Sequence, residues 1–253
     1  MSSSSPRPPG DPVSPEQSQA LGLDRREIPQ RSTTWAAKAA DILHRARLSP
    51  NQISVLSVLF ALVGAIALVW SATVGDPARI GLLAVAAACM PLRLLCNMLD
   101  GMLAVEKKLH SPTGDLFNEL PDRIADVLLL AAAGYATAHA VVISSNFALD
   151  VGVLVGWLAA VLALFTAYVR TLGAAQGVKN YFDGPMAKPA RMWVLVLACL
   201  ASMLEPAVDI TRGLVLFIAL AVIATGSLLT VIIRLRRIVA AVRAKEAARA
   251  KEL

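Results

Sequence analysis

Carboxylate and amide side chains gather where two neighbouring apolar segments of this 253-residue chain meet a short basic loop. Asn97 and Asp100 stand near the end of the first segment, and Asn118 and Asp122 stand near the start of the second. Acids are costly beside a bilayer, so a cluster of them at the edge of apolar segments indicates a functional site. Carboxylate and amide oxygens suit hard divalent cations such as Mg²⁺, Mn²⁺ or Ca²⁺, and the lack of histidine in the cluster argues against zinc.

Helical spacing would bring these side chains onto facing surfaces. Asn97, Asp100 and Ala104 follow the i, i+3, i+7 pattern of one helix face. The loop is short, which favours antiparallel neighbouring helices, so the two polar faces are expected to meet at the same depth. Five polar residues of the second helix share a stripe about 100° wide: Asp115, Asn118, Glu119, Asp122 and Asp126.

A divalent cation at such a cluster would imply a particular class of substrate. Mg²⁺ usually keeps several waters and takes substrate phosphates as ligands, so a phosphate-bearing substrate is implied. Gly101 and Ala104 leave room for a ligand to approach the backbone, and Gly114 either does the same or ends the loop. The structural alternative is that Asp115 and Glu119 only cap the second helix, since acids are common at helix N-termini.

The composition indicates an integral membrane protein with one helical domain. Hydrophobic residues make up 57% of the chain and charged residues 17%, and the mean hydropathy is +0.62. A soluble domain has about 45–50% apolar and about 25% charged residues. The net charge of +6 indicates a membrane-surface bias rather than nucleic-acid binding, because the basic residues flank apolar segments.

The hydropathy pattern predicts an all-α integral membrane protein with six transmembrane helices plus an N-terminal amphipathic interfacial helix. A spanning helix needs roughly 20 apolar residues, and the fifth segment is the shortest. The predicted spans are 52–72, 79–104, 115–140, 150–174, 190–205 and 213–235.

Three regions are expected along the chain. Residues 1–32 lack apolar periodicity and predict a disordered cytoplasmic tail. The membrane domain is expected over 33–237, beginning with a basic amphipathic helix at 33–48 that would lie in the membrane interface. Residues 238–253 form a charged, alanine-rich segment that predicts a solvated or membrane-surface helix.

Lysine and arginine are concentrated in the two termini and in alternate loops, and only Arg79 and Arg212 fall in the remaining loops. Basic loops face the cytoplasm, so both termini and the 105–114 loop are predicted to be cytoplasmic. The acidic cluster would then open to the cytoplasmic side of a bacterial-type inner (plasma) membrane.

One basic residue, Arg93, falls inside an apolar segment, on the Asn97–Asp100 face. An unpaired arginine there is costly, so a partner is expected. Asp126, one turn deeper than Asp122 on the facing helix, is the candidate for a structural ion pair.

The cluster resembles the signature of the CDP-alcohol phosphotransferase family, D-x-x-D-G-x-x-A-R-x8-G-x-x-x-D-x-x-x-D. The chain matches it at Asp100, Gly101, Ala104, Gly114 and Asp122, and its eight-residue spacer is also correct. The six helices, the cytoplasmic site and the N-terminal interfacial helix are similar to the family as well. The resemblance covers about residues 33–237, the predicted membrane domain.

The resemblance implies roles for these residues. Asp100, Gly101, Ala104 and Gly114 would bind CDP, and Asp122 would be the general base. Three positions depart from the signature: Asn97 and Asn118 replace acids, and Val105 replaces the arginine. The family's four acids hold two divalent metals, Mg or Mn. Here either one ion remains, or Glu119 and Asp115 supply the missing charge. The implied metal ligands are Asp100, Asp122, Asn97, Asn118 and Glu119.

The implied reaction belongs to phospholipid biosynthesis. The phosphatidyl group of CDP-diacylglycerol is transferred to an alcohol acceptor, and CMP is released. Arg170, Lys188 and Arg191 are the candidates for binding the acceptor or a phosphate, since arginine suits phosphate; the alternative is that they only set the positive-inside topology. The implied partners are these substrates and membrane lipids, with no nucleic acid, and a homodimer is left open.

Three other functions stay open at this point. The first is an enzyme that uses another CDP-alcohol or a lipid acceptor. The second is a catalytically silent or specialised relative that binds a nucleotide, lipid or partner. The third, a small cation transporter, is the least favoured, because the acids cluster at one surface instead of forming a path.

Overall fold

The computed structural model describes residues 49–106, 114–137, 140–141 and 150–250, with the side chains of 104–118 left out. The predicted tail at 1–32 and the predicted interfacial helix at 33–48 lie outside the described residues.

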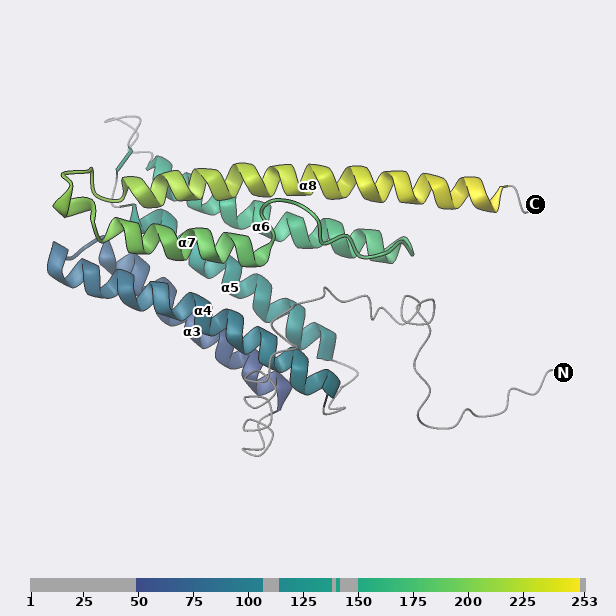
Figure 1. The fold of residues 1–253 in the computed structure, drawn as a ribbon, viewed down its shortest axis with the longest axis horizontal. Coiled ribbons are helices and arrows are strands. Elements are labelled where there is room, and N and C mark those ends of the chain that lie inside the picture. The colour runs from purple at the N-terminus through teal and green to yellow at the C-terminus, as the bar shows by residue number, and fades with distance from the viewer. Residues whose placement is uncertain (1–48, 107–113, 138–139, 142–149, 251–253) are drawn as a thin grey trace.

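The described chain is all-α, as predicted, with six α-helices and one 3₁₀ turn. Five of the six are long and apolar enough to cross a membrane. The exception is α5, whose first half carries several charged side chains, so the count of six spanning helices stays a prediction. The elements are α3 (Pro50–Ser71), α4 (Asp76–Glu106), α5 (Gly114–Ala136), α6 (Val151–Ala175), α7 (Lys188–Ser202), η2 (Glu205–Ala207) and α8 (Leu214–Arg249) (Figure 1).

A capping box sets the start of α3. The Ser49 side chain accepts a hydrogen bond from the Gln52 backbone N–H, and the Gln52 side chain accepts one from the Ser49 N–H. Pro50 occupies the first turn, where its missing N–H costs nothing. The helix therefore begins at a defined residue, and Ser54 falls one turn later, where it contacts α4.

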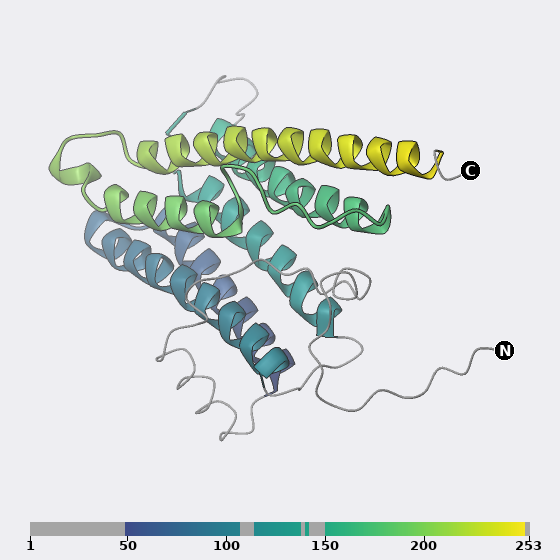
Figure 2. The same ribbon diagram turned by 45° about the vertical axis from the view of Figure 1, so that its right-hand side comes forward.

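The helices pack as two groups joined by α5. α3 packs on both α4 and α5, and α5 packs on α6, which in turn packs on α8. α7 closes the bundle by contacting α4 and α8. Figures 1 and 2 show α5 between the α3–α4 pair and the α6–α8 pair. The main neighbour of α5 is thus α3 and not α4, contrary to the expectation from the short loop. α4 reaches the polar end of α5 through the side chains of Arg93 and Asn97.

Small residues allow the close approach of α5 and α6. A Cβ atom added to Gly156 would lie 2.6 Å from the Gly134 Cα, and one added to Gly134 would lie 2.9 Å from the Gly152 carbonyl oxygen. Helices in membranes commonly pack through such small residues. This contact fixes the apolar half of α5 against α6.

The last helix is longer than a membrane span. α8 has 36 residues, a length of about 54 Å at the usual rise per residue. It continues without a break to Arg249, within the segment predicted as a separate charged helix. Lys245, near its end, donates to the carbonyl oxygens of Gln176 (3.1 Å) and Gly177 (3.3 Å) and so caps the end of α6.

Candidate functional site

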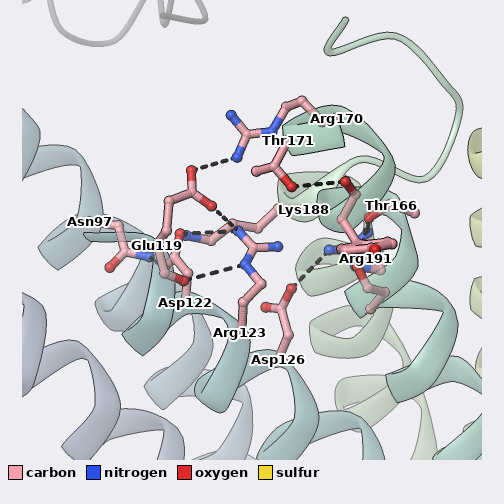
Figure 3. A network of polar contacts seen from close by, with 12 residues as sticks. Asn97, Glu119, Asp122, Arg123, Asp126, Thr166, Arg170, Thr171, Lys188 and Arg191 are labelled. Carbon is pink, nitrogen blue, oxygen red and sulfur yellow. Dashed lines mark hydrogen bonds and ion pairs between the residues drawn. The ribbon is translucent and has the colours of Figure 1, made fainter. Parts of the chain in front are cut away.

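A polar network lies at the end of the bundle where α4 ends and α5 begins, and side chains from α4, α5, α6 and α7 meet in it (Figure 3). Its labelled members are Asn97, Glu119, Asp122, Arg123, Asp126, Thr166, Arg170, Thr171, Lys188 and Arg191.

Asp122 is the most heavily contacted acid of the network. Lys188 Nζ lies 2.5 Å from its Oδ2 atom, and the Asn97 amide donates a hydrogen bond to Oδ1. Two guanidinium groups lie slightly farther away, with Arg93 Nη2 at 3.6 Å from Oδ1 and Arg123 Nη2 at 3.7 Å from Oδ2. Both carboxylate oxygens therefore face positive groups or an amide donor.

Asp100 has a different environment. Its side chain is buried, and its Oδ2 atom accepts a 2.6 Å hydrogen bond from Ser54 Oγ. Its Oδ1 atom is also buried but has no hydrogen-bond partner. A buried carboxylate oxygen without a partner is costly, so this atom is suited to receive a cation or a donor from a ligand.

Asp126 lies deeper, between two arginines. Arg93 Nη2 is 2.8 Å from its Oδ1 atom and Arg191 Nη2 is 2.8 Å from its Oδ2 atom, and all three side chains are at most 1% exposed. Arg93 also donates to the Asp122 carbonyl oxygen at 3.0 Å. One buried negative charge thus faces two buried positive charges, and the cluster fixes α5 against α4 and α7.

Arg191 is occupied by the protein's own groups. Besides Asp126, its Nη1 atom donates to the Met186 carbonyl oxygen (2.9 Å) and to Thr166 Oγ1 (3.2 Å). Of the three basic residues considered for an acceptor, Arg191 is the one buried inside the bundle. The other two remain partly exposed, Arg170 at 15% and Lys188 at 20%.

Glu119 connects α5 to α6 at the mouth of the site. Its Oε1 atom lies 2.5 Å from Arg170 Nη2, and its Oε2 atom lies 3.4 Å from Arg123 Nη2. The Arg170 guanidinium also lies over the Phe182 ring, 5.3 Å from the ring centre. Glu119 thus balances the positive charge of Arg170, which would otherwise be available to bind an anion.

The loop between α6 and α7 is held in place by α8. Arg234 donates to the carbonyl oxygens of Phe182, Asp183 and Thr166. The Met186 N–H donates to Thr230 Oγ1 at 3.0 Å. These contacts fix the start of α7, whose first residue is Lys188.

Most of the residues predicted from the sequence come together here. Asn97 and Lys188 contact Asp122, Glu119 contacts Arg170, and Asp100 lies one helical turn from Asn97. The ion pair between Arg93 and Asp126 belongs to the same cluster. Gly101 is buried beside Asp100 and Gly114 begins α5, whereas the side chains of Ala104, Asp115 and Asn118 lie outside the described residues.

Sequence reasoning missed three contributors to the site. Ser54 stands one turn after a capping box, a signal only for a helix start, and nothing local indicates that it meets Asp100. Arg123 was not assigned a role, although it follows Asp122 directly. Arg234 was considered only as one of the basic residues near the C-terminus, because its role depends on a loop 51 residues earlier in the chain.

The described residues leave one buried carboxylate oxygen, Asp100 Oδ1, open to a hard cation. Among them, no group of three or more His, Cys, Asp and Glu side chains could hold a metal ion. The Asp100 Oδ1 atom can donate a lone pair to an ion whose further ligands come from water or a substrate phosphate. At Asp122 the corresponding lone pairs are already directed at Lys188 and Asn97.

The sequence matches no protein-family model and no curated protein. Solved structures with a similar fold include the phosphatidylinositol phosphate synthase PgsA1 of Mycobacterium tuberculosis. Its complex with manganese and citrate is 20% identical, with a TM-score of 0.62 over 80% of this chain and 88% of that chain. Its complex with CDP-DAG is 19% identical, with a TM-score of 0.62 over 80% and 92%.

The apo form of the same synthase is 20% identical, with a TM-score of 0.59 over 79% of this chain and 93% of that chain. The likeness extends over 88–93% of the synthase chain. This protein is an all-α membrane protein with the fold of the phosphatidylinositol phosphate synthases.

Proposed function

We propose that this protein is a divergent member of the CDP-alcohol phosphotransferase family that transfers a phosphatidyl group from CDP-diacylglycerol to an alcohol and releases CMP. The observation that carries the proposal is that two acids at one end of the bundle, Asp100 and Asp122, have different surroundings. Asp100 on α4 offers a buried oxygen without a partner, and Asp122 on α5 faces Lys188 and Asn97, the latter one turn from Asp100. The shared fold with a synthase solved with CDP-DAG supports the same substrate.

The cofactor of this reaction is a divalent cation, Mg or Mn. Asp100 Oδ1 would hold it together with the pyrophosphate oxygens of the substrate, and Asn118 is a further ligand that the signature suggests. When bound, the ion neutralises charge that builds up on the phosphates. Gly101, Ala104 and Gly114 are proposed to let the CDP group approach the backbone.

The chemistry requires one proton transfer and one displacement. The Asp122 carboxylate accepts the proton of the acceptor hydroxyl, and the resulting alkoxide oxygen bonds to the phosphorus that carries the diacylglycerol. The bond from that phosphorus to the CMP oxygen breaks, and CMP leaves with the electron pair. Lys188 and Arg170 stabilise negative charge on the phosphate oxygens, which is the main protein contribution in phosphoryl transfer.

The acceptor is proposed to bind at the exposed edge of the network, beside Arg170 and Lys188. Arg191 is buried beneath Arg170 and Lys188 in this proposal and does not contact the acceptor. It positions the site by bonding to Asp126 and to the Met186 carbonyl oxygen just before α7. The site opens to the cytoplasmic side of the inner membrane in this proposal, with both chain termini on the same side.

The direct test is CMP release from labelled CDP-diacylglycerol by the purified protein, with a panel of acceptor alcohols and Mg²⁺ or Mn²⁺. We expect Asp122→Asn to lower the rate about 100- to 10,000-fold, the usual contribution of a general base. The control is Asp183→Asn, an exposed acid paired with Arg237 outside the network. Release that is unchanged in Asp122→Asn would contradict the proposed mechanism.

A second candidate is a relative that binds CDP-diacylglycerol without turning it over. It is favoured by the contacts of Lys188 and Asn97, which engage both oxygens of the proposed base. This function predicts saturable binding of CDP-diacylglycerol with no CMP release for any acceptor. It also predicts that Asn97→Asp combined with Asn118→Asp restores release.

A further inference from the structure

The carboxylate of Asp122 is surrounded by the protein's own cations. Of the groups that face it, Lys188 and the Asn97 amide make direct contacts, while Arg93 and Arg123 lie within 4 Å. These groups come from α4, α5 and α7, so the arrangement depends on the tertiary fold. Figure 3 shows Lys188 reaching toward Asp122 from the α7 side.

We propose that the ammonium group of Lys188, together with the Asn97 amide, takes the position beside Asp122 that a second divalent cation would need. The site would therefore hold one divalent cation per chain, at Asp100. That the bound ion is a cofactor rests on the proposed function. It adds a role to Lys188, which becomes a fixed internal cation next to the reacting phosphates.

Charge is the first reason. A dication bound at Asp122 would meet the Lys188 ammonium group at the carboxylate itself. It would also lie near the guanidinium groups of Arg93 and Arg123, which are partly balanced by Asp126 and Glu119. Like charges at these separations repel strongly in a buried site, where the effective dielectric constant is low. At Asp100 the described hydrogen-bond partner is the neutral Ser54 hydroxyl, and one oxygen is left without a partner.

The chemistry of Asn97 is the second reason. An amide has two N–H donors, so it can bond directly to the Asp122 carboxylate, as it does here. An aspartate at position 97 would repel Asp122 and would require a cation between the two acids. The asparagine and the lysine therefore complement each other: one removes a negative charge from the site, and the other supplies a positive charge.

The position of Lys188 is the third reason. It is the first residue of α7, preceded by the Ala187 cap and by Met186, whose N–H is tied to Thr230 on α8. Its side chain is only 20% exposed, so it does not extend freely into solvent. The fold thus holds the ammonium group at the carboxylate.

The test is a Mn²⁺ titration of the purified full-length protein, with bound ion counted by electron paramagnetic resonance. We expect one Mn²⁺ per wild-type chain and none in Asp100→Asn. The double variant Asn97→Asp/Lys188→Met should bind two. Two matched controls should bind one, because they keep a cation at position 188: Asn97→Asp/Lys188→Arg and Asn97→Asp/Arg237→Met.

A wild-type stoichiometry other than one would overturn the inference, as would a single ion in Asn97→Asp/Lys188→Met. The Lys188→Arg control separates a change in ion binding from a loss of folding. The count does not depend on turnover, so one ion per chain without any CMP release would refute the proposed function and leave this inference in place.

Discussion

The charges in the buried cluster of Arg93, Asp126 and Arg191 predict which substitution in it lowers stability more. One carboxylate lies 2.8 Å from each of two guanidinium groups, and all three are at most 1% exposed. Replacing Asp126 by Asn keeps the shape of the side chain but leaves two buried arginines facing a neutral amide. Replacing Arg93 by Met leaves a balanced pair of Asp126 and Arg191.

The two losses should therefore differ in size. Removing one partner of a buried ion pair usually costs about 3–5 kcal/mol. Asp126→Asn should reach that range because it removes the acid paired with Arg191 and leaves Arg93 with only the more distant Asp122 carboxylate at 3.6 Å. That is a large part of a typical folding free energy of about 5–15 kcal/mol. Arg93→Met should cost less, and the double variant should cost less than the sum of the two single variants by about 0.5–3 kcal/mol.

The assay is reversible unfolding in mixed detergent micelles, followed by far-ultraviolet circular dichroism across the four members of the cycle. The control is the exposed pair of Arg237 and Asp183, whose removal should change stability by about 0–1 kcal/mol. Strictly additive losses in the Arg93–Asp126 cycle, or a larger loss for Arg93→Met than for Asp126→Asn, would refute the reasoning.

Three further predictions concern the surroundings of the site. Glu119→Gln frees Arg170, so on the proposed function the protein should accept phosphorylated acceptors better relative to neutral ones, measured as the ratio of CMP release rates. An unchanged ratio would mean that Glu119 does not set the preference for acceptor charge. Ser54→Ala removes the hydrogen bond to Asp100 and should destabilise the protein by about 1–3 kcal/mol, with Ser57→Ala as the control because the Ser57 hydroxyl has no partner. Gly156→Leu should prevent the close approach of α5 and α6 and abolish the folded state in the same unfolding assay, whereas Gly81→Leu, which has open space, should not.

Much of the fold could be predicted because the helices follow local physics. The length of each apolar run in the sequence indicates a membrane segment, and the Ser49–Gln52 capping box indicates the start of α3. The partner of Arg93 could be named from depth alone, since Asp126 is the acid expected at that level on the facing helix.

The contacts made by α7 could not be predicted in the same way. Lys188 and Arg191 belong to a segment more than 60 residues from the acids they contact in the chain. Hydropathy gives neither the rotation of α7 nor the path of the loop before it. The loop is set by Arg234 on α8, so the position of Lys188 depends on two other segments.

The two halves of α5 explain how a membrane protein can hold such a site. The second half is apolar and packs tightly on α6 through Gly134 and Gly156, which fixes the helix. The first half carries Asp122 and Asp126, whose charges are met by basic groups from α4 and α7. α5 falls outside the set of helices apolar enough to cross a membrane because it carries the site, and its neighbours compensate its acids with cations of their own. Internal compensation of this kind reduces the need for external cations at Asp122, which is the physical basis of the single-ion proposal.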